Sequence, residues 1–223
     1  MAVSTIRQAQ TRGGGAATPE GFLFELSGGA LCLDFVNTVD NRPVEPTELL
    51  DSYDDLVAWA EQTGVLEPAL AATLRAEAGR RPDAAAAALD GARALREAVH
   101  AVLTAASRGA APPPDSLGML ESAVAPSMAR RRLIQTPAGF AWVWAYDDHA
   151  LDGLLAPVVE SAATLLTSPD LARVRECEAE TCGWLFLDRS RNRSRRWCDM
   201  SVCGNRAKVR RHYQRTRDKK SGV

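Results

Sequence analysis

The chain of 223 residues is 46% apolar and 25% charged, which is typical of a soluble globular protein and not of a disordered or fibrous one. No apolar run approaches the roughly 20 residues of a membrane span. Met1–Thr18 carries Arg7 and Arg12 without an apolar block behind them, so no secretory signal is indicated and a cytoplasmic location is expected. The net charge of −1 conceals an uneven distribution: 14 basic and 25 acidic residues up to position 187, then 13 basic and 3 acidic residues. A basic C-terminal segment on an acidic body indicates a polyanionic partner.

The first 20 residues are rich in Gly, Ala, Thr and Gln and offer little to bury. Residues 1–20 are therefore predicted to form a disordered leader. The next segment, Phe22–Val36, has short apolar groups on either side of Gly28 and Gly29. This pattern predicts a hairpin or a strand that leads into a helix.

The segment from residue 49 to residue 125 is predicted to be helical. In the first helix, Leu49–Gln62, apolar residues share one face, with Thr47 as the N-cap and Gly64 as the stop. Pro and Gly residues separate the next helices, which are Pro68–Ala78, Asp83–Ser107 and Asp115–Ala125.

The segment Arg131–Ala145 departs from the helical pattern. Aromatic residues alternate with small ones after a Pro-Ala-Gly turn, which predicts a β-hairpin. A last body helix, His149–Leu166, is expected to be capped by Asp147 or Asp148 and to end at the domain boundary. The expected fold is mainly α with small β-hairpins (α+β), with a helical N-terminal domain over residues 21–170 and a small module over residues 171–218.

The helical body carries no catalytic constellation: no Gly-rich phosphate loop, no zinc-protease motif and no nucleophile elbow. An enzyme is therefore the least favoured class. A ligand pocket is conceivable from a polar group at the end of an apolar run and from two tryptophans, the candidates being Asp34, Asn37, Thr38, Trp59 and Trp142. Local hydrogen bonds by the polar residues and core packing by the tryptophans explain the same pattern and are favoured.

Four of the five cysteines lie in two pairs near the C-terminus. Four residues separate Cys177 from Cys182, four separate Cys198 from Cys203, and fifteen lie between the pairs. Two such pairs can supply the four thiolates of one tetrahedral zinc ion, and a module of about 40 residues needs such a staple. With four protein ligands the zinc is structural. An iron–sulfur cluster is the alternative, but the Arg-rich surroundings and the symmetrical spacing favour zinc.

The spacer between the pairs predicts a small hairpin. Trp184–Leu187 is expected to be one strand, Arg195–Cys198 the returning strand, and Arg189–Arg193 an exposed turn. After the last ligand, Gly204 and Asn205 can start a helix that runs to about Arg217. A knuckle, a hairpin and a helix in this order are the arrangement of a treble-clef zinc finger.

The last ligand also carries a resemblance to a known family. Cys203-Gly204-Asn205-Arg206, with WLFLDRSRNRSRRWC before it and AKVRRHYQR after it, resembles the CGNR zinc finger over roughly residues 173–217. LCLDFVNT at Leu31–Thr38 resembles the ABATE domain, which accompanies this finger in bacterial proteins described as stress-induced transcription regulators. The resemblance implies one structural zinc ion on Cys177, Cys182, Cys198 and Cys203, and a DNA-binding role.

Basic residues crowd this module at a density that is costly unless a polyanion neutralises it. Arg206, Arg210, Tyr213 and Arg217 share one face of the expected helix, while Val209 is left to pack inward. The candidate nucleic-acid-binding residues are Arg189, Arg191, Arg193, Arg195, Arg196, Arg206, Lys208, Arg210, Arg211, Tyr213 and Arg217. Alternatively, these arginines form a solvated face or dock onto the acidic body of the same chain or of a partner subunit.

These observations favour a DNA-binding transcriptional regulator. Duplex DNA is favoured over RNA, because the aromatic residues that could stack on bases are few and most of them suit the core of the module. An adaptor that binds an acidic protein and an RNA-associated factor are the alternatives. Control of the finger by a small-molecule effector or by homodimerisation through the body would suit the two-part layout.

Overall fold

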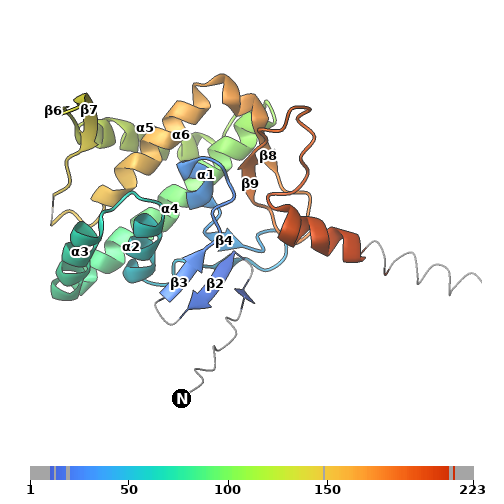
Figure 1. Cartoon of the computed structure of the whole chain (residues 1–223), viewed down its shortest axis with the longest axis horizontal. Helices are drawn as coiled ribbons and strands as arrows, with labels where there is room; N and C mark the ends of the chain where they lie inside the picture. Colours follow the sequence, from blue (N-terminus) through green and yellow to red (C-terminus); the bar gives the residue numbers. More distant parts are fainter. Residues whose placement is uncertain (1–10, 13, 19–20, 148, 211–212, 214–223) are drawn as a thin grey trace, which may run out of the picture.

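The computed structural model describes residues 11–12, 14–18, 21–147, 149–210 and 213 of the chain. A helical body occupies one side of the molecule and the cysteine-rich module lies at one end of it (Figure 1). The expected fold class, mainly α with small antiparallel sheets, is confirmed.

A three-stranded antiparallel sheet begins the described chain. Its strands are β1 (Thr11–Arg12), β2 (Gly15–Thr18) and β3 (Gly21–Phe24), in the order β1-β2-β3. The prediction of a disordered leader up to residue 20 is therefore wrong for these strands, and residues 1–10 lie outside the described part. Strand β2 gains its order from pairing with β3. A Cβ on Gly15 would lie 2.2 Å from the Leu23 carbonyl oxygen, so only a glycine permits this close approach.

The next elements lead into the core of the body. They are α1 (Leu31–Val36), the paired strands β4 (Val39–Asp40) and β5 (Thr47–Glu48), and α2 (Tyr53–Gln62). Thr47 is not a helix cap, because it lies in β5. Ser52 caps α2 in a reciprocal capping box with Asp55, so the helix begins later than predicted. The expected stop is confirmed, since Gly64 has a positive φ of 73° directly after the helix.

Four longer helices complete the body. They are α3 (Pro68–Arg80), α4 (Pro82–Ser107), α5 (Pro114–Met128) and α6 (Ala156–Leu166). The α3, α4 and α5 predictions are confirmed to within a few residues at their ends, because proline occupies the first turn of each. α4 packs against α1, α2, α3, α5 and α6, so it forms the centre of the body.

The last body helix begins later than predicted. Gly153–Leu155 forms a 3-10 turn, and α6 starts at Ala156 with Pro157 in its first turn. Asp147 accepts a hydrogen bond from His149 N at 2.9 Å and so stabilises a turn, not a helix start. Asp148, the alternative cap, lies outside the described residues.

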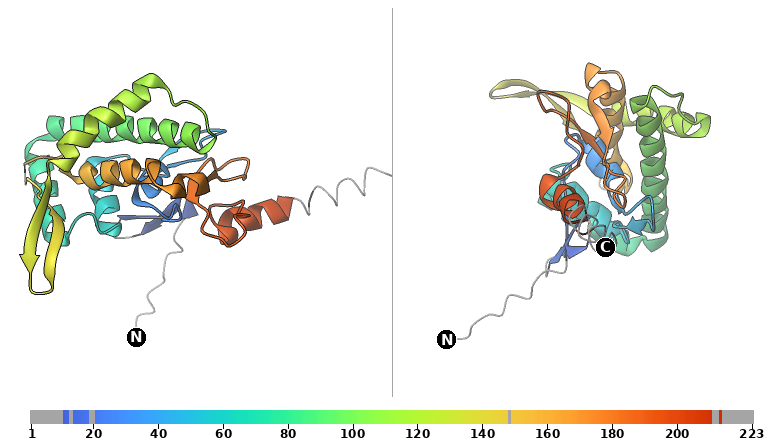
Figure 2. Two further views of the ribbon diagram at one scale, coloured as in Figure 1. Left: turned by 90° about the horizontal axis from the view of Figure 1, so that it is seen from above. Right: turned by 90° about the vertical axis from the view of Figure 1, so that its right-hand side faces the viewer.

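A hairpin stands out from the helices between α5 and α6. It consists of β6 (Arg131–Thr136) and β7 (Gly139–Trp144), as predicted, and Figure 2 shows it projecting from the body. The end of the molecule that carries it lies opposite the cysteine-rich module (Figure 1).

The cysteine-rich module has a different hairpin from the one predicted. β8 (Val174–Glu176) pairs antiparallel with β9 (Leu185–Leu187), so the two strands flank the first cysteine pair. Arg195–Cys198 does not form the expected returning strand, because its backbone groups bond elsewhere: Arg195 N to the Asp188 carboxylate and Arg196 O to Glu178 N. A turn of π-helix, Met200–Gly204, leads into an α-helix over 205–210.

Candidate metal centre and nucleic-acid interface

The four paired cysteines meet at one point. The Sγ atoms of Cys177, Cys182, Cys198 and Cys203 all lie within 4.8 Å of one another, and all four residues are buried. The Sγ atoms of Cys182 and Cys198 are 3.6 Å apart, as are those of Cys198 and Cys203. A disulfide would bring two sulfurs to about 2 Å, whereas four sulfurs bound at about 2.3 Å to a tetrahedral zinc ion lie about 3.8 Å apart.

The chemistry of the four thiols also fits a divalent cation. Hydrogen bonding with Cys182 and the other thiols lowers the pKa of Cys177, and hydrogen bonding with Cys177 raises the pKa of both Cys182 and Cys198. Four thiols this close cannot all ionise without a cation, because the thiolates would repel one another. A zinc ion removes that repulsion and binds all four thiolates, leaving no open position for catalysis. The protein therefore holds one structural zinc ion.

Tight turns present both cysteine pairs. In the first knuckle Cys182 N donates to Ala179 O at 3.0 Å, and Gly183 follows with a φ of 71°. In the second knuckle the Asp199 carboxylate accepts from Ser201 N at 2.6 Å and from Val202 N at 2.9 Å. These hydrogen bonds hold the loops that a small module could not order by apolar burial alone.

The helix over 205–210, called the finger helix below, begins within the tetrapeptide Cys203-Gly204-Asn205-Arg206, and each residue of this tetrapeptide has a distinct role. Cys203 is the fourth ligand, and a Cβ on Gly204 would lie 2.8 Å from the Met200 sulfur and 3.2 Å from Cδ1 of Trp197. The Asn205 side chain donates to Ser201 O at 2.8 Å and so satisfies a carbonyl of the preceding turn. Arg206 follows on the side of the helix that faces the body.

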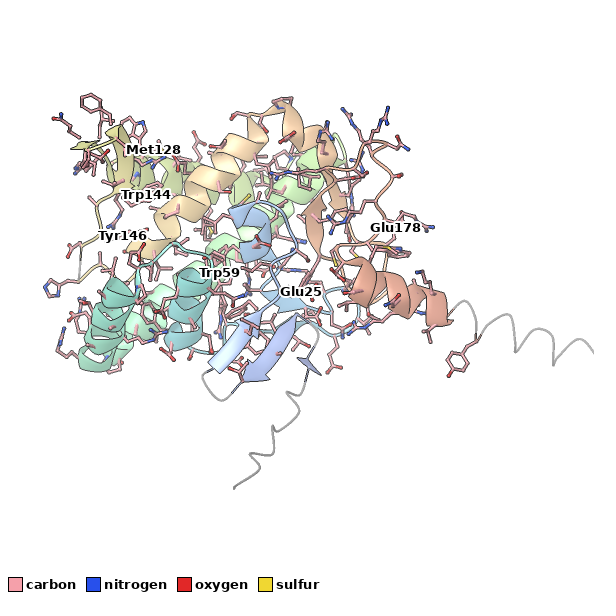
Figure 3. The ribbon with its side chains drawn as sticks, in the orientation of Figure 1. Glu25, Trp59, Met128, Trp144, Tyr146 and Glu178 are labelled. Carbon is pink, nitrogen blue, oxygen red and sulfur yellow. The ribbon has the colours of Figure 1, made fainter. Side chains whose placement is uncertain are left out.

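Arg206 lies among carboxylates of the body. Burial raises the pKa of Glu25 and of Asp40, and the Arg206 guanidinium opposes that rise in both. Glu25 lies between the N-terminal sheet and the finger helix (Figure 3). Arg206 thus has an acidic neighbour within its own chain, which is the alternative that the charge distribution left open.

Several other arginines of the predicted interface also have partners within the chain. Arg196 Nε donates to Glu178 at 2.6 Å, Arg210 forms an ion pair with Glu180, and Arg189 donates to Gly29 O at 3.2 Å. Arg195 donates to the carbonyl oxygens of Trp197 and Cys198, and its guanidinium lies 4.7 Å from the centre of the Phe186 ring. Arg195 therefore has a structural role inside the finger.

The remaining members of the predicted interface divide into three groups. In the part of the chain that the structure describes, Arg191, Arg193 and Lys208 are exposed and their side chains form no hydrogen bond or ion pair. Tyr213 is exposed as well, while Arg211 and Arg217 lie outside the described residues. Val209 does not pack inward as predicted: it is 55% exposed beside Tyr213, because the helix projects past the small core of the finger.

A buried carboxylate shapes the arginine-rich loop, and sequence reasoning missed it. Asp188 is fully buried, and its two oxygens accept from Ser190 N at 2.9 Å and from Arg195 N at 3.0 Å. Burial alone would raise the pKa of Asp188, but these hydrogen bonds and the charge of Arg175 outweigh it and lower that pKa. These two hydrogen bonds fix the ends of the loop 189–194, and the side chains of Arg191 and Arg193 are exposed on its outer surface. Arg193 has a positive φ of 49°, which marks the tight bend of the loop.

The finger is joined to the body by hydrogen bonds and by a shared core. Asn37 is buried and bonds both backbone groups of Leu185, and Trp184 Nε1 donates to Val39 O at 2.9 Å. Val174, Leu185 and Leu187 belong to the main hydrophobic core, while Trp184 and Phe186 pack around the cysteines, as expected for core residues. The finger is therefore packed against the body and shares its hydrophobic core, instead of being joined to it by a linker alone.

The five candidate pocket residues do not come together as one pocket. Asp34 accepts from Gly28 N at 2.8 Å, and Thr38 donates to Phe35 O at 2.7 Å, so both have the local role. Trp59 is fully buried against Phe35 in the interior (Figure 3). Trp142 is 60% exposed on the projecting hairpin, since β7 has no helix across that face.

A helical body with a docked four-cysteine zinc finger defines a two-part, zinc-binding protein. Its sequence places it in a family: the model of the ABATE family, described as putative stress-induced transcription regulator, matches residues 29–169, and the chain belongs to that family. The model of the CGNR zinc finger matches residues 173–216, which contain all four ligands. Both resemblances are thereby confirmed. No curated protein matches the chain.

The helices give one further result. None of those in the described ranges has both the length and the apolar character that crossing a membrane requires.

Proposed function

We propose that this protein is a cytoplasmic transcription regulator that binds duplex DNA through the arginine-rich loop and the finger helix. The observation that carries the proposal is the loop 189–194, where a buried carboxylate fixes the backbone and leaves the side chains of Arg191 and Arg193 exposed without partners in the described structure. Arginine forks suit bidentate contacts to phosphate oxygens or to a guanine edge. The acidic body repels DNA, so it favours contact through the finger alone.

Within this proposal the arginines contribute unequally. Arg191, Arg193 and Lys208 contact phosphates directly, because no carboxylate of the described chain holds them. Arg196 and Arg210 must first give up Glu178 and Glu180, so their contribution is smaller. Arg195 contributes by shaping the finger.

The test is the binding of the zinc-loaded protein to duplex DNA, measured by fluorescence anisotropy over a range of salt. We expect a steep fall in affinity with salt, with a slope that decreases by about 1 for each phosphate contact removed. Arg191→Ala and Arg193→Asn should each weaken binding roughly tenfold, asparagine being chosen because it tolerates the positive φ. Arg132→Ala, which removes the same charge at the opposite end of the molecule, is the matched control.

The alternatives give different results in the same assay. Tighter binding of single-stranded RNA than of duplex DNA would replace this proposal with an RNA-associated factor. Capture of an acidic protein, with no salt-dependent DNA binding, would make the finger an adaptor.

We propose further that a small-molecule effector controls the finger from a groove between the two parts. The groove has a volume of about 900 Å³ and lies between β3 and the finger helix, where Leu23 and Phe24 face Val202, Val209 and Tyr213. An apolar ligand there would touch the element that carries the DNA-facing residues. A compound that raises the melting temperature of the wild type but not of Val209→Asp, and that changes DNA affinity, would support this site. A set of such compounds acting equally on both proteins would exclude it.

A further inference from the structure

The hairpin β6–β7 is a two-stranded sheet that projects from the body and packs little against the helices. Each strand pairs only with the other in the described chain, and Figures 1 and 2 show the pair projecting away from the helices. Its base is held by Arg131, which donates to Glu160 of α6 at 2.7 Å and lies 4.5 Å from the Trp144 ring. A two-stranded hairpin alone is marginally stable in water, so this one needs a further surface to pack against.

The exposed side chains of the hairpin are mostly apolar. Leu133 stands opposite Trp142, and Phe140 lies two residues before Trp142 on the same face. Phe140 is 74% exposed, Trp142 60% and Leu133 57%. Exposed apolar side chains gathered in this way mark an interaction surface.

The outer edge of β7 presents backbone N–H and C=O groups that another strand can bind. Ala145 N donates to Arg130 O at 2.8 Å, which makes the residues at the base of the hairpin a hydrogen-bonded pair. Because such pairs alternate along an antiparallel ladder, Phe140, Trp142 and Trp144 direct their backbone N–H and C=O groups away from β6. β7 has no charged residue, no proline and no bulge, which are the devices that protect exposed edges.

We propose that β7 of one copy pairs antiparallel with β7 of a second copy, so that two hairpins form one four-stranded sheet about a two-fold axis. A strand that pairs with itself in this way makes a closed two-fold interface that occupies the free β7 edge of both copies. The apolar faces of the two hairpins then lie side by side on the same face of the sheet, where side chains of the two β7 strands contact one another across the axis.

The charges of the hairpin permit β7 to pair with a second β7 and oppose the same pairing of β6. Two uncharged β7 strands meet without repulsion, whereas pairing through β6 would bring Arg131 and Arg132 of both copies to the same sheet edge. The hairpin and the zinc finger lie at opposite ends of the molecule (Figure 1), so this dimer leaves both fingers free. The inference does not depend on DNA binding.

The test is the mass of the full-length, zinc-loaded protein in solution, measured by sedimentation velocity between about 1 and 100 µM. The wild type should be a dimer. Trp142→Pro removes an outward N–H that bonds only to the partner, and Phe140→Lys places two like charges at the interface. Each should raise the dimer dissociation constant by about 100-fold or more.

Two controls separate the interface from general effects. Leu117→Gln changes an exposed apolar residue of α5 away from the hairpin and should leave the dimer intact. Trp142→Thr keeps the N–H and should weaken the dimer less than Trp142→Pro does. If Trp142→Pro disturbs the fold, as seen by circular dichroism, Phe140→Lys decides. A monomeric wild type at 100 µM, or a dimer unchanged by Phe140→Lys, would overturn the proposal.

Discussion

Asn37 of the body holds Leu185 of the finger by both of its backbone groups. Asn37 Nδ2 donates to Leu185 O at 2.9 Å, and Leu185 N donates to Asn37 Oδ1 at 3.0 Å, both in the buried interior. The Asn37 amide thus makes the two hydrogen bonds to Leu185 that the backbone of a neighbouring strand would otherwise make. The residue that ends the first apolar helix of the body thereby fixes the strand that precedes the second pair of zinc ligands.

We therefore predict that Asn37→Leu destabilises the body and the zinc site together. The substitution leaves a buried N–H and a buried C=O of Leu185 without partners, at a cost of about 2–4 kcal/mol. Urea denaturation should show that loss, and transfer of zinc to a colorimetric chelator should become faster. Asn192→Ala, on the exposed loop, is the control and should change neither quantity. An unchanged rate of zinc transfer in Asn37→Leu would contradict the coupling.

The Asn37–Leu185 pair also shows what the sequence could and could not predict. Cysteine spacing gave all four ligands, and prolines with apolar periodicity gave α3 to α5, because these signals are local. Asn37 was a candidate only for a local or pocket role, since nothing local reveals a partner 148 residues away. The charge distribution left open that the arginines contact the acidic body, but nothing local identifies Glu25 and Asp40 as the carboxylates near Arg206. The hydrogen bonds of Asp188 to Ser190 and Arg195 are likewise absent from the sequence prediction, because they depend on how the loop folds.

Removal of the metal is predicted to affect the whole molecule, because Val174, Leu185 and Leu187 of the finger lie in the main core. The zinc-loaded protein should unfold in one calorimetric transition. A chelator, or Cys198→Ser, should lower its midpoint and reduce the unfolding enthalpy as the finger loses order. Cys32→Ser changes a cysteine outside the cluster and should keep one zinc per chain. A finger that melts alone, with the body transition unmoved, would show that the two parts are independent.

Asp34 offers a pH-dependent prediction. Burial raises the pKa of its carboxyl to about 6, although Gly28 N donates to it. Because the folded pKa lies above the unfolded value, the ionised carboxylate costs stability above pH 6, and the cost falls as the pH drops from 6 towards 4. The shift corresponds to about 3 kcal/mol at neutral pH.

Asp34→Asn keeps an acceptor for Gly28 N and removes the charge. It should therefore stabilise the protein against urea by about 1–3 kcal/mol at pH 7.5, and by roughly half as much at pH 5. At both pH values the carboxyl is still mostly ionised in the unfolded state, so the difference between the folded and unfolded pKa still affects stability. The exposed Asp51→Asn is the control and should give a small effect that does not vary with pH. Destabilisation by Asp34→Asn at pH 7.5 would mean that the carboxylate is needed in its charged form.

The hydrogen bonds that Asp188 makes to the loop 189–194 allow the effect of loop geometry on DNA binding to be separated from the effect of positive charge. Asp188→Asn removes no positive charge, but an amide can accept only through its oxygen, so one of the two N–H groups, of Ser190 or of Arg195, loses its partner. The loop should then open and its arginines lose their fixed spacing. We expect DNA affinity to fall about tenfold while the salt dependence keeps its slope, because the same arginines still contact the same number of phosphates once they are bound. Anisotropy titrations at several salt concentrations measure both quantities, and Arg191→Ala should instead reduce the slope. Should Asp188→Asn bind DNA as tightly as the wild type, the fixed geometry of the loop would not be what DNA recognises.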